Sequence, residues 1–154
     1  MRLFLGVVLL IICTFIGYIK SNKYYFRRLF YDDFLQFNSR LKNEVAFKQS
    51  TIKNLLENEK SETDFIKVLK TNIIFNQDLP FNINYLNETE LKQYKDYVLD
   101  IGTGDKVLQM EFLQRVDEEV SKKQKQCRED EEKYKKLYVK LGFFIGLILL
   151  ILVL

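Results

Sequence analysis

The chain of 154 residues contains no histidine and no tryptophan. Without histidine it lacks the commonest metal ligand and the commonest general base of enzymes. In addition, no serine, cysteine or lysine nucleophile stands near a candidate base in the sequence. We therefore expect a protein that is not an enzyme and that holds no metal ion and no cofactor.

Proline and glycine are also scarce, with one proline and six glycines. These two residues interrupt helices most strongly, and leucine, isoleucine, lysine, glutamate and phenylalanine are abundant in their place. The composition predicts an all-α protein. The only two cysteines, Cys13 and Cys127, fall in separate predicted helices far apart in the chain, so we expect no disulfide.

A charge excess of one sign is missing as well. The 24 basic and 21 acidic residues leave a net charge of +3, and the two signs are interleaved. This pattern argues against a nucleic-acid partner. The acidic run at residues 129–132 is followed one helical turn later by lysines, so we interpret it as a solvated helix face with ion pairs rather than a metal site.

Two apolar runs lie at residues 3–19 and 141–154. The first carries no charge and is at the short end of what spans a bilayer. A cleaved signal peptide is the competing interpretation, but its cleavage site needs small residues, and Ala46 is the only alanine. The second run reaches spanning length if Lys140 extends its side chain to the membrane surface. We predict transmembrane helices at residues 1–20 and 140–154.

Basic residues flank both apolar runs on the side that faces the middle of the chain. Because lysine and arginine mark the cytoplasmic side of a membrane, residues 21–139 are predicted to form a cytoplasmic helical bundle between the two spans. The same cations are predicted to anchor the chain at the lipid headgroups. They are Lys23, Arg27, Arg28, Lys136 and Lys140.

About five helices are expected in all, and two of them are long. Helical spacing of apolar residues over 24–44 extends the first long helix, and residues 45–49 are predicted to form a turn. A short helix is expected at 51–58. Ser61 and Asp64 resemble a capping box that opens the next helix.

Two stronger end signals follow. Asn87 and Glu90 form a second capping-box pattern, and the Gly102-Thr-Gly104-Asp105 sequence predicts a corner where Asp105 caps the last helix. From there, residues spaced by three and four form a mostly apolar stripe, which charges at Lys123 and Asp130 interrupt as in a partly solvated seam. The stripe consists of Leu113, Val116, Val120, Lys123, Cys127, Asp130, Tyr134, Leu137 and Leu141.

With this layout the sequence resembles the stage III sporulation protein AB family of endospore-forming bacteria. Members carry Leu-Gly, Ser-Asp and Gln at the spacing of Ile101-Gly102, Gly104-Asp105 and Gln109. Lys133-Tyr134, Lys140-Leu141-Gly142 and Gly146 also match. Two features depart from the family: Gly104 replaces a serine, and residues 48–52 lack the usual glycine and proline.

The resemblance implies a role. The family looks like half of the F-type platform protein of type II secretion and type IV pilus machines, whose cytoplasmic helical domains dock on a hexameric ATPase. It implies a non-enzymatic platform in the mother-cell membrane around the forespore. Its partners would be membrane lipid, a sporulation secretion ATPase resembling stage III sporulation protein AA, and other components of the channel that feeds the forespore.

The corner that carries the best family match is predicted to lie at the distal tip of two long helices. Our hypothesis is that Gly102, Asp105 and Gln109 help to bind the ATPase; the alternative is that they only shape the corner. A different function is also open. The chain would then be a membrane-tethered coiled-coil scaffold that forms a homo-oligomer through the stripe of its last helix.

Overall fold

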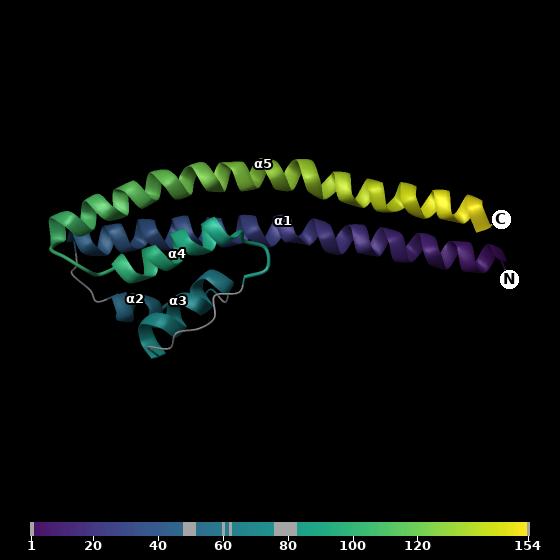
Figure 1. Cartoon of the computed structure of the whole chain (residues 1–154). Helices are drawn as coiled ribbons and strands as arrows, with labels where there is room; N and C mark the ends of the chain where they lie inside the picture. The colour runs from purple at the N-terminus through teal and green to yellow at the C-terminus, as the bar shows by residue number, and fades with distance from the viewer. Residues whose placement is uncertain (1, 48–51, 60, 62, 76–82, 154) are drawn as a thin grey trace. The chain divides into compact units, whose positions relative to one another are not determined.

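The computed structural model describes residues 2–47, 52–59, 61, 63–75 and 83–153. Within these ranges the regular secondary structure is entirely helical, which confirms the all-α prediction (Figure 1). The helices are α1 (Arg2–Phe47), α2 (Ile52–Glu57), α3 (Asp64–Phe75), α4 (Glu88–Asp100) and α5 (Lys106–Val153).

The chain forms two compact units. The first, which we call the two-helix unit, consists of Met1–Arg28 and Gln126–Leu154. The second, the core unit, consists of Leu29–Lys125. Helices α1 and α5 contribute residues to both units without an intervening loop.

In the two-helix unit, α1 and α5 run antiparallel, with Gly6 against Leu150 and Gly17 against Gly142 (Figure 1). The backbones approach so closely that a Cβ on Gly142 would lie 2.6 Å from the carbonyl oxygen of Cys13. A Cβ on Gly17 would likewise lie 2.6 Å from the carbonyl oxygen of Tyr138. Small residues at such contacts are typical of helix pairs in a membrane, where tight packing must replace the hydrophobic effect.

Most other side chains of this unit's apolar segments point outward and are exposed, among them Phe4, Phe15, Phe144 and Leu152. Among the described residues, one helix contains a stretch long and apolar enough to cross a membrane. It is α1, over Phe4–Ala46, with a mean hydropathy of 2.1 in its most apolar window, of which 17% is buried. Such a helix near the amino terminus is compatible with a membrane anchor. The second span, at 140–154, stays a prediction.

The core unit is organised around aromatic side chains from α1, α3 and α4. The rings of Phe34 and Phe65 stack with centroids 4.9 Å apart, and Phe30 meets Tyr94 edge-on at 5.3 Å. All four side chains are buried. Aromatic pairs of this kind contribute about 0.5–1.5 kcal/mol each beyond the area they bury. Other large apolar side chains that are fully buried in this unit include Phe37, Leu41, Leu56, Ile66, Leu69 and Leu113.

A polar contact fixes how α1 and α5 pair in the core unit. The side-chain amide of Asn38, which is buried, donates to the carbonyl of Leu113 at 2.9 Å and to the carboxylate of Asp117 at 3.2 Å. Lys42 adds an ion pair to the same carboxylate at 3.1 Å. Because a buried polar group must find partners, sliding one helix along the other would carry a cost.

Three local predictions need correction. The first is the turn at residues 45–49, because α1 continues to Phe47. The Nζ atom of Lys106 donates to the carbonyl of Ala46 at 2.9 Å, which supplies a partner for a carbonyl near the helix end. Lys48 and Gln49 lie outside the described residues, as do Ser50 and Thr51 at the predicted start of α2.

The second correction concerns Ser61. Helix α3 begins at Asp64, and the carbonyl of Thr63 accepts the first backbone hydrogen bond, from Lys67, at 2.9 Å. The hydroxyl of Ser61 donates instead to the carboxylate of Asp33 on α1 at 2.9 Å, and the hydroxyl of Thr63 donates to the same carboxylate. Ser61 therefore does not cap α3 as the local pattern predicts, because its hydroxyl binds a carboxylate on another helix.

The third correction concerns the end of the stripe. Leu113, Val120 and Cys127 are buried, but Leu137 and Leu141 are 43% and 46% exposed. A repeat of 3.5 residues drifts by about 20° per heptad around a straight helix, hence about 80° over four heptads. In the two-helix unit, α1 is met instead by another face of α5, which carries Tyr138, Gly142 and Gly146.

Candidate functional site

The corner between α4 and α5 has the geometry that the sequence predicts. Gly102 and Gly104 have φ angles of +81° and +84°, a region that favours glycine. A carboxylate oxygen of Asp105 accepts the backbone amide of Leu108 at 2.9 Å, so Asp105 caps α5. At the position where family members carry serine, this chain has Gly104, whose positive φ a serine would adopt only with strain.

The three residues predicted to bind the ATPase differ in exposure. Gly102 and Asp105 are exposed, whereas Gln109 is only 6% exposed. Among the described residues, neither polar atom of the Gln109 side chain has a hydrogen-bond partner. The ATPase could reach Gln109 only if the corner opened. Direct contact between Gln109 and the ATPase stays a prediction, and the burial of Gln109 argues against it.

Apolar side chains that the sequence reasoning missed lie exposed near this corner. Leu99 at the end of α4 is 73% exposed, and Val107 and Leu108 at the start of α5 are 65% and 59% exposed. Exposed apolar patches mark contact surfaces, and these three side chains are candidates for one. The sequence could have identified them by their helical positions, because they do not share a face with the buried apolar residues of their helices.

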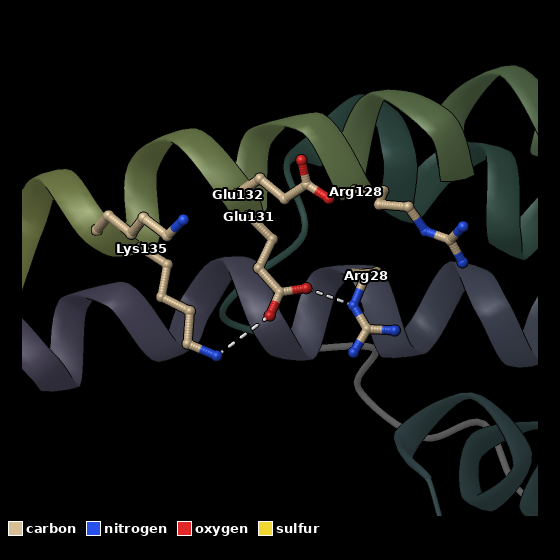
Figure 2. A pocket seen from close by; sticks show the side chains of 6 residues that line it. Arg28, Arg128, Glu131, Glu132 and Lys135 are labelled. Atoms are coloured by element: carbon tan, nitrogen blue, oxygen red, sulfur yellow. Dashed lines mark hydrogen bonds and ion pairs between the residues drawn. The ribbon is translucent and has the colours of Figure 1, made fainter.

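The predicted anchor residues lie in the two-helix unit, and two of them hold α1 to α5. Arg27 forms an ion pair with Asp130 at 3.3 Å, and Arg28 forms one with Glu131 (Figure 2). Lys135 reaches the same Glu131 carboxylate at 3.3 Å from one turn further along α5. Asp130 and Glu131 of the acidic run therefore form ion pairs with arginines of α1. Glu131 also pairs with a lysine of its own helix, as the sequence predicts. Lys23, Lys136 and Lys140 are exposed.

These charges surround an open cleft of about 480 Å³ (Figure 2). One cation comes from α1 and three come from α5, against two carboxylates, so the lining carries a net positive charge. The lining residues are Arg28, Arg128, Glu131, Glu132, Lys135 and Lys136. We call this the basic cleft.

Aromatic rings also pack between α1 and α5 in the two-helix unit. Tyr24 stacks on Tyr134 and Tyr138 with centroids 5.1 and 5.8 Å apart. Burial, and then the hydroxyl of Tyr138, raises the pKa of Tyr24 to about 12. The stacked rings thus add to the contact between α1 and α5 in the two-helix unit.

No cluster of three or more histidine, cysteine, aspartate or glutamate side chains suited to a metal ion occurs in the part of the chain that the structure describes. Cys13 and Cys127, which both belong to that part, are not joined by a disulfide.

The sequence model of the family described as stage III sporulation protein AB matches residues 74–154. No curated protein and no solved structure matches the chain. The matched segment contains the corner, all of α5 and most of the basic cleft, and it makes up just over half of the chain. The chain therefore belongs to the stage III sporulation protein AB family.

Proposed function

We propose that this protein is a non-enzymatic platform component of the channel that feeds the forespore during sporulation. It couples a secretion-type ATPase to that channel in the mother-cell membrane. The observation that carries the proposal is the family match over residues 74–154, which supports a role in sporulation. The coupling role is proposed by analogy with platform proteins of secretion machines.

The packing of the two-helix unit supports the membrane part of the proposal. A pair of apolar helices that meets through glycines and exposes phenylalanine and leucine on its outer surface suits lipid better than water. In the proposed arrangement both helices span the bilayer and the core unit is cytoplasmic, as the positive-inside rule favours.

The exposed corner supports the coupling part. We assign the ATPase contact to Leu99, Val107 and Leu108, in place of the buried Gln109. The competing scaffold function needs the stripe of α5 to be free for a second chain. Burial of Leu113, Val120 and Cys127 within a single chain weighs against it.

Topology is the first test. The variant carries Lys125→Cys as an exposed probe, with Cys13→Ala and Cys127→Ser removing the native thiols. Cells are treated with a membrane-impermeant maleimide before and after permeabilisation, and a variant without cysteine measures the background. Labelling only after permeabilisation supports a cytoplasmic core unit. Labelling of intact cells would place that unit outside and end the platform proposal.

The second test measures binding of a stage III sporulation protein AA-like ATPase by co-purification. Leu108→Asp puts a charge into the exposed corner and should reduce recovery of the ATPase by about tenfold or more, the typical cost of losing an interface anchor. Gln114→Asp, at another exposed position of α5, is the matched control and should leave recovery unchanged. Equal recovery with both variants would remove the corner from the interface.

A further inference from the structure

We propose that the basic cleft binds a phosphate-bearing anionic group, with the headgroup of an anionic phospholipid as its source. The inference rests on the membrane placement within the proposed function and does not depend on ATPase coupling.

The available charge comes from Arg128 and Lys136. Both are exposed, and among the described residues neither has an ion-pair partner. Glu131 is already paired with other cations of the lining, because its two oxygens accept from Arg28 and Lys135 (Figure 2). Of the two carboxylates that line the cleft, Glu132 has no ion-pair partner among the described residues, and its negative charge repels an anion.

The lining is also ordered before any ligand arrives. Arg28 lies over the ring of Tyr25 at 5.3 Å, and Lys135 lies over the same ring at 5.2 Å. Glu131 holds both cations as well, one through each oxygen. Side chains that are already held in place lose less entropy on binding, which favours a specific site over a loose basic surface.

Depth argues for a lipid source. Counted back from Lys140, where the apolar run begins, Lys136 lies about 6 Å away and Arg128 about 18 Å away by helix rise. The headgroup layer on each side of a bilayer is about 5–8 Å thick. Lys136 is therefore at headgroup depth, whereas Arg128 lies about 10 Å beyond that layer. A headgroup at Lys136 is drawn towards Arg128 by its charge, because basic pockets between membrane helices attract anionic lipid headgroups.

The experiment uses the full chain purified in a neutral detergent. Calorimetric titrations compare dispersed phosphatidylglycerol, dispersed phosphatidylcholine and inorganic phosphate. Arg128→Gln combined with Lys136→Gln removes the two available cations of the cleft. Lys122→Gln combined with Lys125→Gln removes the same charge from exposed positions of α5 outside the cleft. Circular dichroism checks that each variant remains helical.

We expect phosphatidylglycerol to bind more tightly than phosphatidylcholine. The cleft double variant should weaken this binding by about thirtyfold, or about fivefold for each cation lost. The control double variant should change it by less than about twofold, because exposed charges that do not line the cleft contribute little. Glu132→Gln should strengthen binding, because it removes the opposing charge without truncating a cation.

Several outcomes would overturn the proposal. Equal weakening by the two double variants would show a general attraction to anionic lipid, with no built site. Equal affinity for the two lipids, with no phosphate binding, would leave the cleft without a ligand. If inorganic phosphate bound tightly and the cleft double variant lost this binding, the anion site would stand but a lipid would be excluded as its ligand. Because ATPase recovery is tested through Leu108, either proposal can fail alone.

Discussion

At the scale of single residues, the glycines of the two-helix unit leave the least room for change. A methyl group on Gly142 would lie 2.6 Å from a backbone oxygen, which cannot move aside as a side chain could. Gly142→Ala should therefore separate the helices and lower the free energy of unfolding by about 1–3 kcal/mol, as overpacking does. Thermal unfolding of the full chain in detergent, followed by circular dichroism, measures the effect.

The matched control is Val7→Ile, which adds one methylene to an exposed position of the same unit. It should leave the midpoint of unfolding nearly unchanged. If Gly142→Ala were as harmless as Val7→Ile, the close approach of α1 and α5 would be wrong.

A second residue-scale prediction contrasts two buried tyrosines of α4. The hydroxyl of Tyr94 donates to the carbonyl of Phe65 at 3.0 Å, whereas that of Tyr97 has no partner among the described residues. Tyr94→Phe should cost about 1 kcal/mol of stability, and Tyr97→Phe should be neutral or stabilising. Chemical unfolding of both variants in detergent measures the difference. A larger loss for Tyr97→Phe would reveal a partner for its hydroxyl.

Alkaline pH tests the same two residues. Burial raises the pKa of both Tyr94 and Tyr97 above the ordinary value of 10.0. The folded state therefore keeps a proton that the unfolded state loses above pH 10.0, so stability is fully present below that pH and declines as pH rises beyond it. Tyr97→Phe should make the decline shallower, which unfolding at pH values on both sides of 10.0 would reveal. An unchanged slope would contradict the buried phenol.

At the scale of elements, the corner between α4 and α5 depends on two glycines in the left-handed region. Alanine at either position should cost about 1–2 kcal/mol from backbone strain. Gly102→Ala should cost slightly more than Gly104→Ala, because a Cβ on Gly102 would also lie 2.7 Å from the terminal methyl of Ile52, which must shift aside. Denaturant unfolding of both variants measures the order, and a reversed order would contradict the contact between the corner and α2.

At the scale of the whole molecule, the division into two units predicts that the core unit folds alone. A fragment of residues 29–125 keeps the aromatic cluster and the Asn38 contact to α5, so it should be soluble and helical. It should also be monomeric, because Leu113 and Val120 of its part of the stripe are already buried. Sedimentation at several concentrations tests this expectation. A concentration-dependent dimer would revive the scaffold function.

Much of this molecule could be anticipated because its signals are local. Scarce proline and glycine predicted helices, and the Asn87–Glu90 capping box and the Asp105 cap both formed as expected. Each of these depends on atoms within about one helical turn, where sequence order and spatial proximity coincide.

Other features required the fold, because their partners are distant in the chain. Asp33 takes the hydroxyl of Ser61, and Arg27 finds Asp130 across 103 positions of sequence. Burial of Gln109 likewise follows from how α5 packs in the core unit, not from its neighbours in sequence. Helical periodicity tells which residues share a face, but contact between helices decides which face is covered and how far along the helix it stays covered.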